Sequence, residues 1–172
     1  LYNIEDSSFM SVTYVDQFGG YVADFGTYME SYSLRSEQEV KDIVSYIEST
    51  KEAFPSYLLF VQTKLDKGYG LSDYTINEMR GYLSDVLKDE ENYYLVDVLS
   101  QKIDKLEFLT DAQKEDYKNQ VVTAMKDCFM VGVQELYDGL ETFIGKVAKE
   151  EEGYWETYEN GKELYKLTLE EL

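Results

Sequence analysis

The single proline of this 172-residue chain, Pro55, is the feature that most restricts its fold. Proline is a strong interruption of regular structure, so a chain with almost none can form long helices. The apolar residues agree, because they recur at helical spacings over most of the chain. We therefore predict an all-α, multi-helix, bundle-like domain.

The clearest helix start is a capping box at Ser36 and Glu39, where each side chain caps the backbone of the other. An apolar stripe at helical spacing follows it: Val40, Ile43, Val44 and Ile47. We expect Pro55 to lie in the first turn of a second helix, where its missing N–H costs nothing. That second helix should end at the turn that contains Gly68 and Gly70.

Further stripes predict the remaining helices. A third helix is expected along Ile76, Met79, Leu83 and Val86, and a fourth along Leu95, Val98, Leu99, Ile103 and Leu106. The longest periodic segment begins at a second capping box, Thr110 and Gln113. Its stripe changes phase near Gly132, so either one helix is kinked there or two helices meet; we favour a kinked helix that ends at the acidic run 150–152. A last helix is expected from Gly161 to Leu172.

Residues 1–33 differ from the rest because aromatic side chains and glycines dominate them. We expect irregular chain with one short helix, held down by its rings. The predicted organisation is one helical domain over 1–172, excised from a longer protein, with an aromatic-rich leader at 1–33 and a helical body at 34–172.

The charge excludes several partners. With 35 acidic and 16 basic side chains, the formal net charge is −19. Such a field repels nucleic acid and anionic lipid surfaces. No apolar run approaches the ~20 residues that span a bilayer. We therefore expect no nucleic-acid partner and no transmembrane segment.

The chain contains no histidine, which removes most enzyme chemistries. Neither a Ser-His-Asp nor a Cys-His nucleophile can be assembled, and catalytic zinc is rarely held without histidine. The one cysteine, Cys128, lies on the apolar stripe of the long helix, so we expect a buried, unreactive thiol. The acidic loop from Asp66 to Asp73 fails the calcium-loop pattern, because glycines occupy two ligand positions. We interpret it as the end of one helix and the start of the next.

The most unusual positive feature is the number of tyrosines, 17. We expect most of them to cover helix–helix contacts with their hydroxyls in water. The best candidates for ligand contact are Tyr154, Trp155 and Tyr158, because they cluster on a glycine-flanked segment; Lys162 and Tyr165 follow closely. None of these five residues is predicted to be catalytic.

Several short motifs occur in a recognisable order: Tyr32-Ser33-Leu34-Arg35-Ser36, Pro55-Ser56-Tyr57-Leu58, Gly68-Tyr69-Gly70-Leu71, Lys102-Ile103-Asp104-Lys105-Leu106, Leu109-Thr110 and Gly161-Lys162-Glu163-Leu164-Tyr165. This succession resembles the front half of a bacterial family, domain of unknown function 885. That family is grouped with gluzincin-type zinc metallopeptidases, whose H-E-x-x-H helix lies further toward the C-terminus. The H-E-x-x-H motif is absent here, so no zinc ligand or general base is transferred to this chain.

The resemblance implies a non-catalytic N-terminal part of a zinc-metallopeptidase-like protein. This part would form a wall of a peptide-substrate cleft, and the remaining C-terminal part of the parent would supply the zinc. A bacterial cell-envelope or secreted location fits this interpretation. The alternative is a self-contained, tyrosine-rich helical module that binds a protein or carbohydrate. A third possibility, an enzyme that uses two carboxylates, has no support in the spacing of the acidic residues.

Overall fold

A computed structural model describes residues 15–16, 18–67, 70–88, 93–146 and 166. This part of the chain is all-α and bundle-like, and no strand occurs in it. Its helices are α2 (Gly20–Ser31), α3 (Glu37–Asp66), α4 (Asp73–Lys88), α5 (Tyr94–Asp104), α6 (Asp111–Ala124) and α7 (Met130–Glu141), with a π-helical turn, η1 (Met125–Phe129), between α6 and α7.

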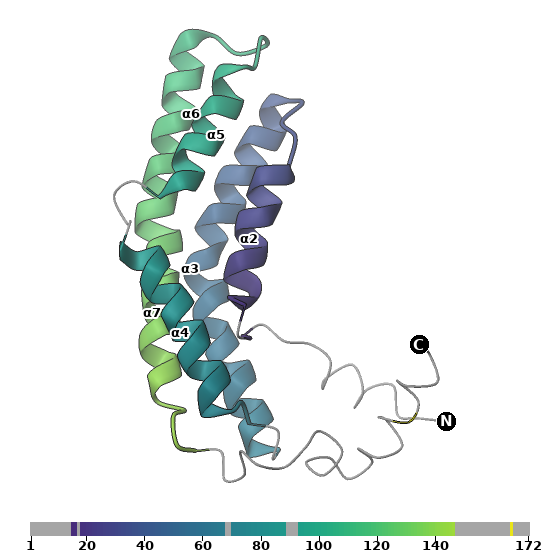
Figure 1. Cartoon of the computed structure of the whole chain (residues 1–172). Helices are drawn as coiled ribbons and strands as arrows, with labels where there is room; N and C mark the ends of the chain where they lie inside the picture. Colours follow the sequence, from purple (N-terminus) through teal and green to yellow (C-terminus); the bar gives the residue numbers. More distant parts are fainter. Residues whose placement is uncertain (1–14, 17, 68–69, 89–92, 147–165, 167–172) are drawn as a thin grey trace.

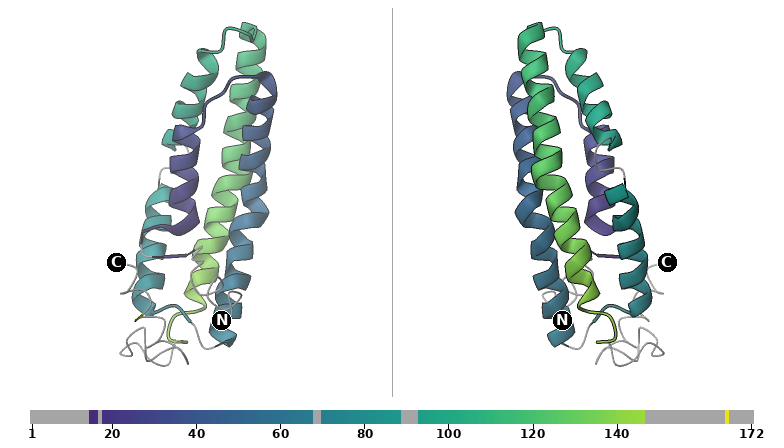
Figure 2. Two further views of the ribbon diagram at one scale, coloured as in Figure 1. Left: turned by 90° about the vertical axis from the view of Figure 1, so that its right-hand side faces the viewer. Right: turned by 90° about the vertical axis from the view of Figure 1, so that its left-hand side faces the viewer.

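The helices form an elongated up-down-up-down bundle (Figure 1). α2 runs toward the end of the bundle at which α3 begins, and α3 then runs back in the opposite direction. α4 and α5 follow one another in the third position, and α6, η1 and α7 form the fourth. The side views in Figure 2 show α3 and the α6–α7 segment side by side, which agrees with their extensive backbone contacts. Within the described residues, no helix is long and apolar enough to cross a membrane.

The expected break at Pro55 is wrong, because α3 runs through this proline without ending. Proline removes one backbone hydrogen bond and is normally costly inside a helix. Here the flanking residues face α7: a Cβ on Gly132 would meet the Thr50 carbonyl and the Phe54 side chain, and a Cβ on Gly139 would meet Leu58. Packing on both sides of Pro55 therefore keeps the segment helical, which local sequence signals do not reveal.

The long helix changes phase at η1, not through a kink at Gly132. A π-turn accommodates an extra residue within a helix, so the buried face passes from Val121 and Met125 to Phe129 and Val133. Gly132 serves a different purpose: its missing Cβ lets α7 approach the backbone of α3. The phase change was predicted, but its cause was assigned to the wrong residue.

The helix also ends earlier than expected, at Glu141, well before the acidic run. Successive turns follow it, with Phe143 N donating to the Leu140 carbonyl (3.1 Å). Gly145 then adopts a positive φ of 73°, which favours glycine. The predicted last helix lies outside the described residues except for Lys166, which is helical.

The other predicted helix starts are confirmed, but the box at Ser36 is only half formed: Ser36 accepts from Glu39 N, whereas the Glu39 carboxylate accepts from Arg35 N. Ser36 and Thr110 cap α3 and α6, and Thr110 forms the reciprocal box with Gln113. The stripes of α4 and α5, and Leu106 just after α5, enter one core, with these side chains buried: Ile76, Met79, Leu83, Val86, Leu95, Leu99, Ile103 and Leu106. Val98 is only half-buried.

The short helix expected in the N-terminal segment is α2, which carries Val22, Phe25 and Met29 into the same core. Lys102 of α5 holds its C-terminal end. The Lys102 ammonium donates to the carbonyl oxygens of Met29, Glu30 and Tyr32, each at 2.7 Å. A cation at a helix C-terminus satisfies carbonyls that lack helical partners. This contact holds the C-terminal end of α2 against α5.

Candidate functional site

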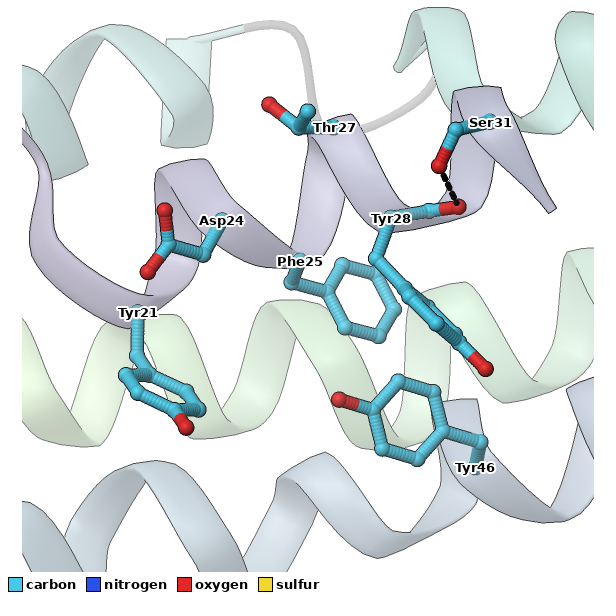
Figure 3. A pocket seen from close by; sticks show the side chains of 7 residues that line it. All are labelled: Tyr21, Asp24, Phe25, Thr27, Tyr28, Ser31 and Tyr46. Atoms are coloured by element: carbon cyan, nitrogen blue, oxygen red, sulfur yellow. Dashed lines mark hydrogen bonds between the residues drawn. The ribbon is translucent and has the colours of Figure 1, made fainter.

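The five residues predicted to contact a ligand, Tyr154, Trp155, Tyr158, Lys162 and Tyr165, lie outside the described residues. A different aromatic site is present between α2 and the first half of α3. We call it the tyrosine groove, a surface pocket of about 400 Å³ lined by Tyr21, Asp24, Phe25, Thr27, Tyr28, Ser31 and Tyr46. All but Tyr46 come from α2 (Figure 3).

Helical spacing explains why α2 supplies most of the lining. Tyr21, Phe25 and Tyr28 are separated by four and three residues, so they project from one side of the helix. Tyr46 comes from α3 and points toward the same space, as Figure 3 shows. The exposed fractions of Tyr21, Tyr28 and Tyr46 are 41%, 44% and 41%, whereas Phe25 is buried. The groove therefore has three accessible tyrosine rings above a buried phenylalanine.

The rings contact one another in two geometries. Tyr46 stacks on Phe25, with centroids 5.6 Å apart and planes at 25°. Tyr28 meets Tyr46 edge to face, at 5.3 Å and 68°. Aromatic pairs in these arrangements contribute about 0.5–1.5 kcal/mol beyond the area they bury. The rings of Tyr28 and Tyr46 thus form a corner whose shape their neighbours maintain.

The π-turn lies directly beneath this corner. Phe129, which is fully buried, stacks on Phe25 with ring centroids 4.9 Å apart. Phe54 and Tyr93 contact the same Phe129 ring at 5.5 and 5.4 Å. The floor of the groove is therefore continuous with the aromatic core.

The polar groups of the groove are few. Asp24 is the one charged residue among those that line it. The Thr27 and Ser31 hydroxyls donate to backbone carbonyls of their own helix, at 3.3 and 3.1 Å. Burial, followed by the neighbouring tyrosines, raises the pKa of Tyr46, so its hydroxyl stays protonated at neutral pH. The groove therefore offers ring faces, the hydroxyls of its three tyrosines and one carboxylate.

The other residues considered for a site, Cys128, Asp66 and Asp73, do not form one together. Cys128 lies in η1 and is half-buried, which corrects the expectation of a fully buried thiol. Burial raises its pKa, which makes the reactive thiolate scarce at neutral pH. Asp66 accepts from Gln62 Nε2 (2.6 Å) and Asp73 accepts from the Gly145 backbone N–H (2.7 Å). Where side chains are described, no three acidic or cysteine residues lie close enough to hold a metal ion.

The Asp66–Asp73 segment does join two helices as predicted, since α3 ends at Asp66 and α4 begins at Asp73. The tyrosine groove was not predicted, although aromatic side chains dominate residues 1–33 of the sequence. Those rings were expected only to hold the leader in place. The sequence signal for the groove is the helical spacing of Tyr21, Phe25 and Tyr28, which puts their rings on one side of α2.

No protein-family model, curated protein or solved structure matches this chain.

Proposed function

We propose that this chain is a non-catalytic helical binding unit that holds a peptide segment in the tyrosine groove. The observation that carries the proposal is the gathering of Tyr21, Tyr28 and Tyr46, partly exposed, around one hollow. Tyrosine combines a flat apolar ring with a hydroxyl, and it is enriched where proteins contact peptides and other proteins.

The polar groups favour a peptide over a carbohydrate. A sugar presents many hydroxyls, so a site for it needs several polar side chains around an open ring face. In the groove, Thr27 and Ser31 already donate to the backbone, and Tyr28 meets the Tyr46 ring edge to face. A side chain of a peptide fits such a corner better than a sugar ring.

The resemblance to the domain of unknown function 885 family supplies a context for this proposal. In such a protein the groove would belong to the wall of the substrate cleft. The residues of this chain do not fit the zinc site of that family, because histidine is absent and the described acidic residues form no cluster of three. We assign it a role in binding and no catalytic step.

A nuclear magnetic resonance titration of the whole chain tests the proposal. The ligands are acetylated Gly-X-Gly amides, one for each natural residue X. We expect at least one of them to shift the ring resonances of Tyr28 and Tyr46 and to leave those of Tyr74, an exposed tyrosine on α4, unchanged. The response should be lost in Tyr46→Leu and kept in the control Tyr74→Leu.

The proposal is wrong if no peptide shifts the groove resonances. It is also wrong if chito- or cello-oligosaccharides shift them while all the peptides do not, since that outcome supports the carbohydrate-binding alternative. The peptidase context is tested separately, by searching the parent gene beyond Leu172 for H-E-x-x-H.

A further inference from the structure

We infer that the side chain received by the tyrosine groove is cationic, an arginine or lysine of the bound peptide. This inference rests on the proposed function and specifies its ligand. Three sets of observations support it: the ring arrangement, the charges around the groove, and a similar contact elsewhere in the molecule.

The first support is the ring arrangement. The face of an aromatic ring carries a partial negative charge, which attracts a cation within about 6 Å of the ring centroid. The centroids of Tyr28 and Tyr46 are 5.3 Å apart with planes at 68°, so a single cation in their corner lies near both rings. Figure 3 shows both side chains extending into the space between α2 and α3.

The second support is the charge around the groove. Asp24 lies three residues after Tyr21 and four before Tyr28, which places it beside both on the helix surface. No basic residue lines the groove. On α3, the exposed Asp42 lies one turn before Tyr46. A cationic side chain would gain from these carboxylates, and an anionic one would be repelled.

More distant charges point the same way. The Tyr32 ring lies 5.3 Å from that of Tyr28, and burial raises the pKa of Tyr32 first, followed by the charges of Glu39 and Asp42, which Arg35 opposes. The chain as a whole carries a net charge of −19. Its field therefore attracts basic peptides before they make contact.

The third support is a contact of the same kind within the fold. The Arg80 guanidinium of α4 lies over the Tyr137 ring, 4.4 Å from its centroid. Its Nε also donates to the Tyr137 carbonyl, and one terminal nitrogen pairs with Glu141 at 3.2 Å. This internal arrangement combines a tyrosine face, a carboxylate and a guanidinium. The groove supplies the first two and lacks the third among its lining residues.

The test compares peptides that differ only in charge. Acetyl-Gly-Arg-Gly amide is titrated against its citrulline counterpart, which keeps the planar group and loses the charge; the lysine peptide is titrated against its norleucine counterpart. We expect each charged peptide to bind on the order of tenfold more tightly than its neutral partner. Tetramethylammonium should compete with the charged peptides.

Variants of the full chain separate the contributions. Asp24→Asn should weaken binding of the arginine peptide about threefold, as expected for one exposed ion pair, and leave the citrulline peptide unchanged. The control Asp138→Asn removes the same charge from the exposed side of α7 and should change neither affinity. Tyr46→Phe keeps the ring and should bind the arginine peptide within about twofold of the original chain.

The outcomes separate this inference from the proposed function. If the charged and neutral peptides bind equally and Tyr46→Leu still abolishes binding, the cation inference is overturned and the peptide groove stands. The same holds if the binding peptides of the Gly-X-Gly set are all uncharged or acidic. If no peptide in the set shifts the groove resonances, the proposed function and the cation inference fall together.

Discussion

The two sides of α3 contact their neighbours in opposite ways. Toward α7, glycines bring the backbones together: a Cβ on Gly132 would lie 2.6 Å from the Thr50 carbonyl oxygen, and one on Gly139 would meet a Leu58 methyl carbon. Toward α2, rings fill the space, and the backbone of α2 packs mainly against α5. The first contact leaves no room for a ligand, whereas the second leaves the tyrosine groove.

This difference suggests a division of roles: the α7 side of α3 contributes mainly to stability, and the α2 side mainly to binding. Close backbone packing creates many short contacts that any added atom disturbs. The tyrosine rings of the groove are about two fifths exposed, so they pack less completely and leave their faces accessible to a ligand. We therefore expect substitutions at the α3–α7 contact to affect unfolding, and substitutions in the tyrosine groove to affect mainly binding.

The largest effect is expected at Phe129, where the two sides of α3 share one ring. Phe129→Ala should lower the free energy of unfolding by about 3–5 kcal/mol, because it removes a fully buried ring from the core. Urea denaturation measures this loss. The control Phe108→Ala removes a half-exposed ring and should cost far less. Similar losses for both variants would contradict the central position of Phe129.

The next effect tests the tight contact alone. Gly132→Ala should destabilise the fold by about 1–3 kcal/mol, because its new methyl group meets backbone that cannot move aside. The matched control is Gly81→Ala on α4, where a Cβ meets nothing within 4 Å. That substitution should stabilise the fold by about 0.5–1 kcal/mol through helix propensity. If both variants shifted the thermal unfolding temperature in the same direction, the tight contact at Gly132 would be contradicted.

A smaller loss is expected when the anchor of α2 is removed. Lys102→Met keeps an apolar stem but loses three hydrogen bonds to the end of α2. The cost should be about 1.5 kcal/mol, since hydrogen bonds to a charged group are involved and the freed carbonyls regain water. Hydrogen exchange should speed up in the last turn of α2 and stay unchanged in α7. Equal changes in both helices would show that Lys102 does not act locally.

In the tyrosine groove, the expected effect on stability is smaller again. Tyr46→Leu should cost about 1 kcal/mol, the value of its stacking on Phe25, because much of the ring is already exposed. Its peptide binding should nevertheless disappear. A loss of stability as large as that of Gly132→Ala would mean that the two sides of α3 are not distinct.

The smallest effect concerns pH and a polar contact between α3 and α6. The Tyr117 hydroxyl donates to the Glu37 carboxylate at 2.7 Å, and this bond, followed by Lys41, holds the pKa of Glu37 below its ordinary value. A lowered carboxyl pKa stabilises the fold above the ordinary value near 4.5 and loses that effect as the pH falls through the lowered value. Tyr117→Phe should therefore be less stable than the original chain at pH 7, and the gap should close in acid. Denaturation at several pH values measures it; a gap that widens in acid would contradict the assignment.

Much of the fold could be predicted from local signals. Ser36 and Thr110 mark helix starts because their side chains replace missing backbone partners, an effect that involves only nearby residues. The stripes of α4 and α5 were predicted for the same reason, since their periodicity reflects one buried face. Only part of the tyrosine groove could be predicted. The spacing of the α2 rings is present in the sequence, but Tyr46, which completes the groove, lies on α3.

The sequence by itself determined an acidic, histidine-free, all-α chain and the positions of most of its helices, because charge, composition and periodicity are properties of single residues and their neighbours. The tertiary structure decided what those signals could not. It kept Pro55 inside α3, since contacts with α7 on both sides outweigh one lost hydrogen bond. It placed the phase change in a π-turn beneath Phe25 and brought Tyr28 to Tyr46. Each of these outcomes depends on residues distant in the sequence that meet only when the helices pack.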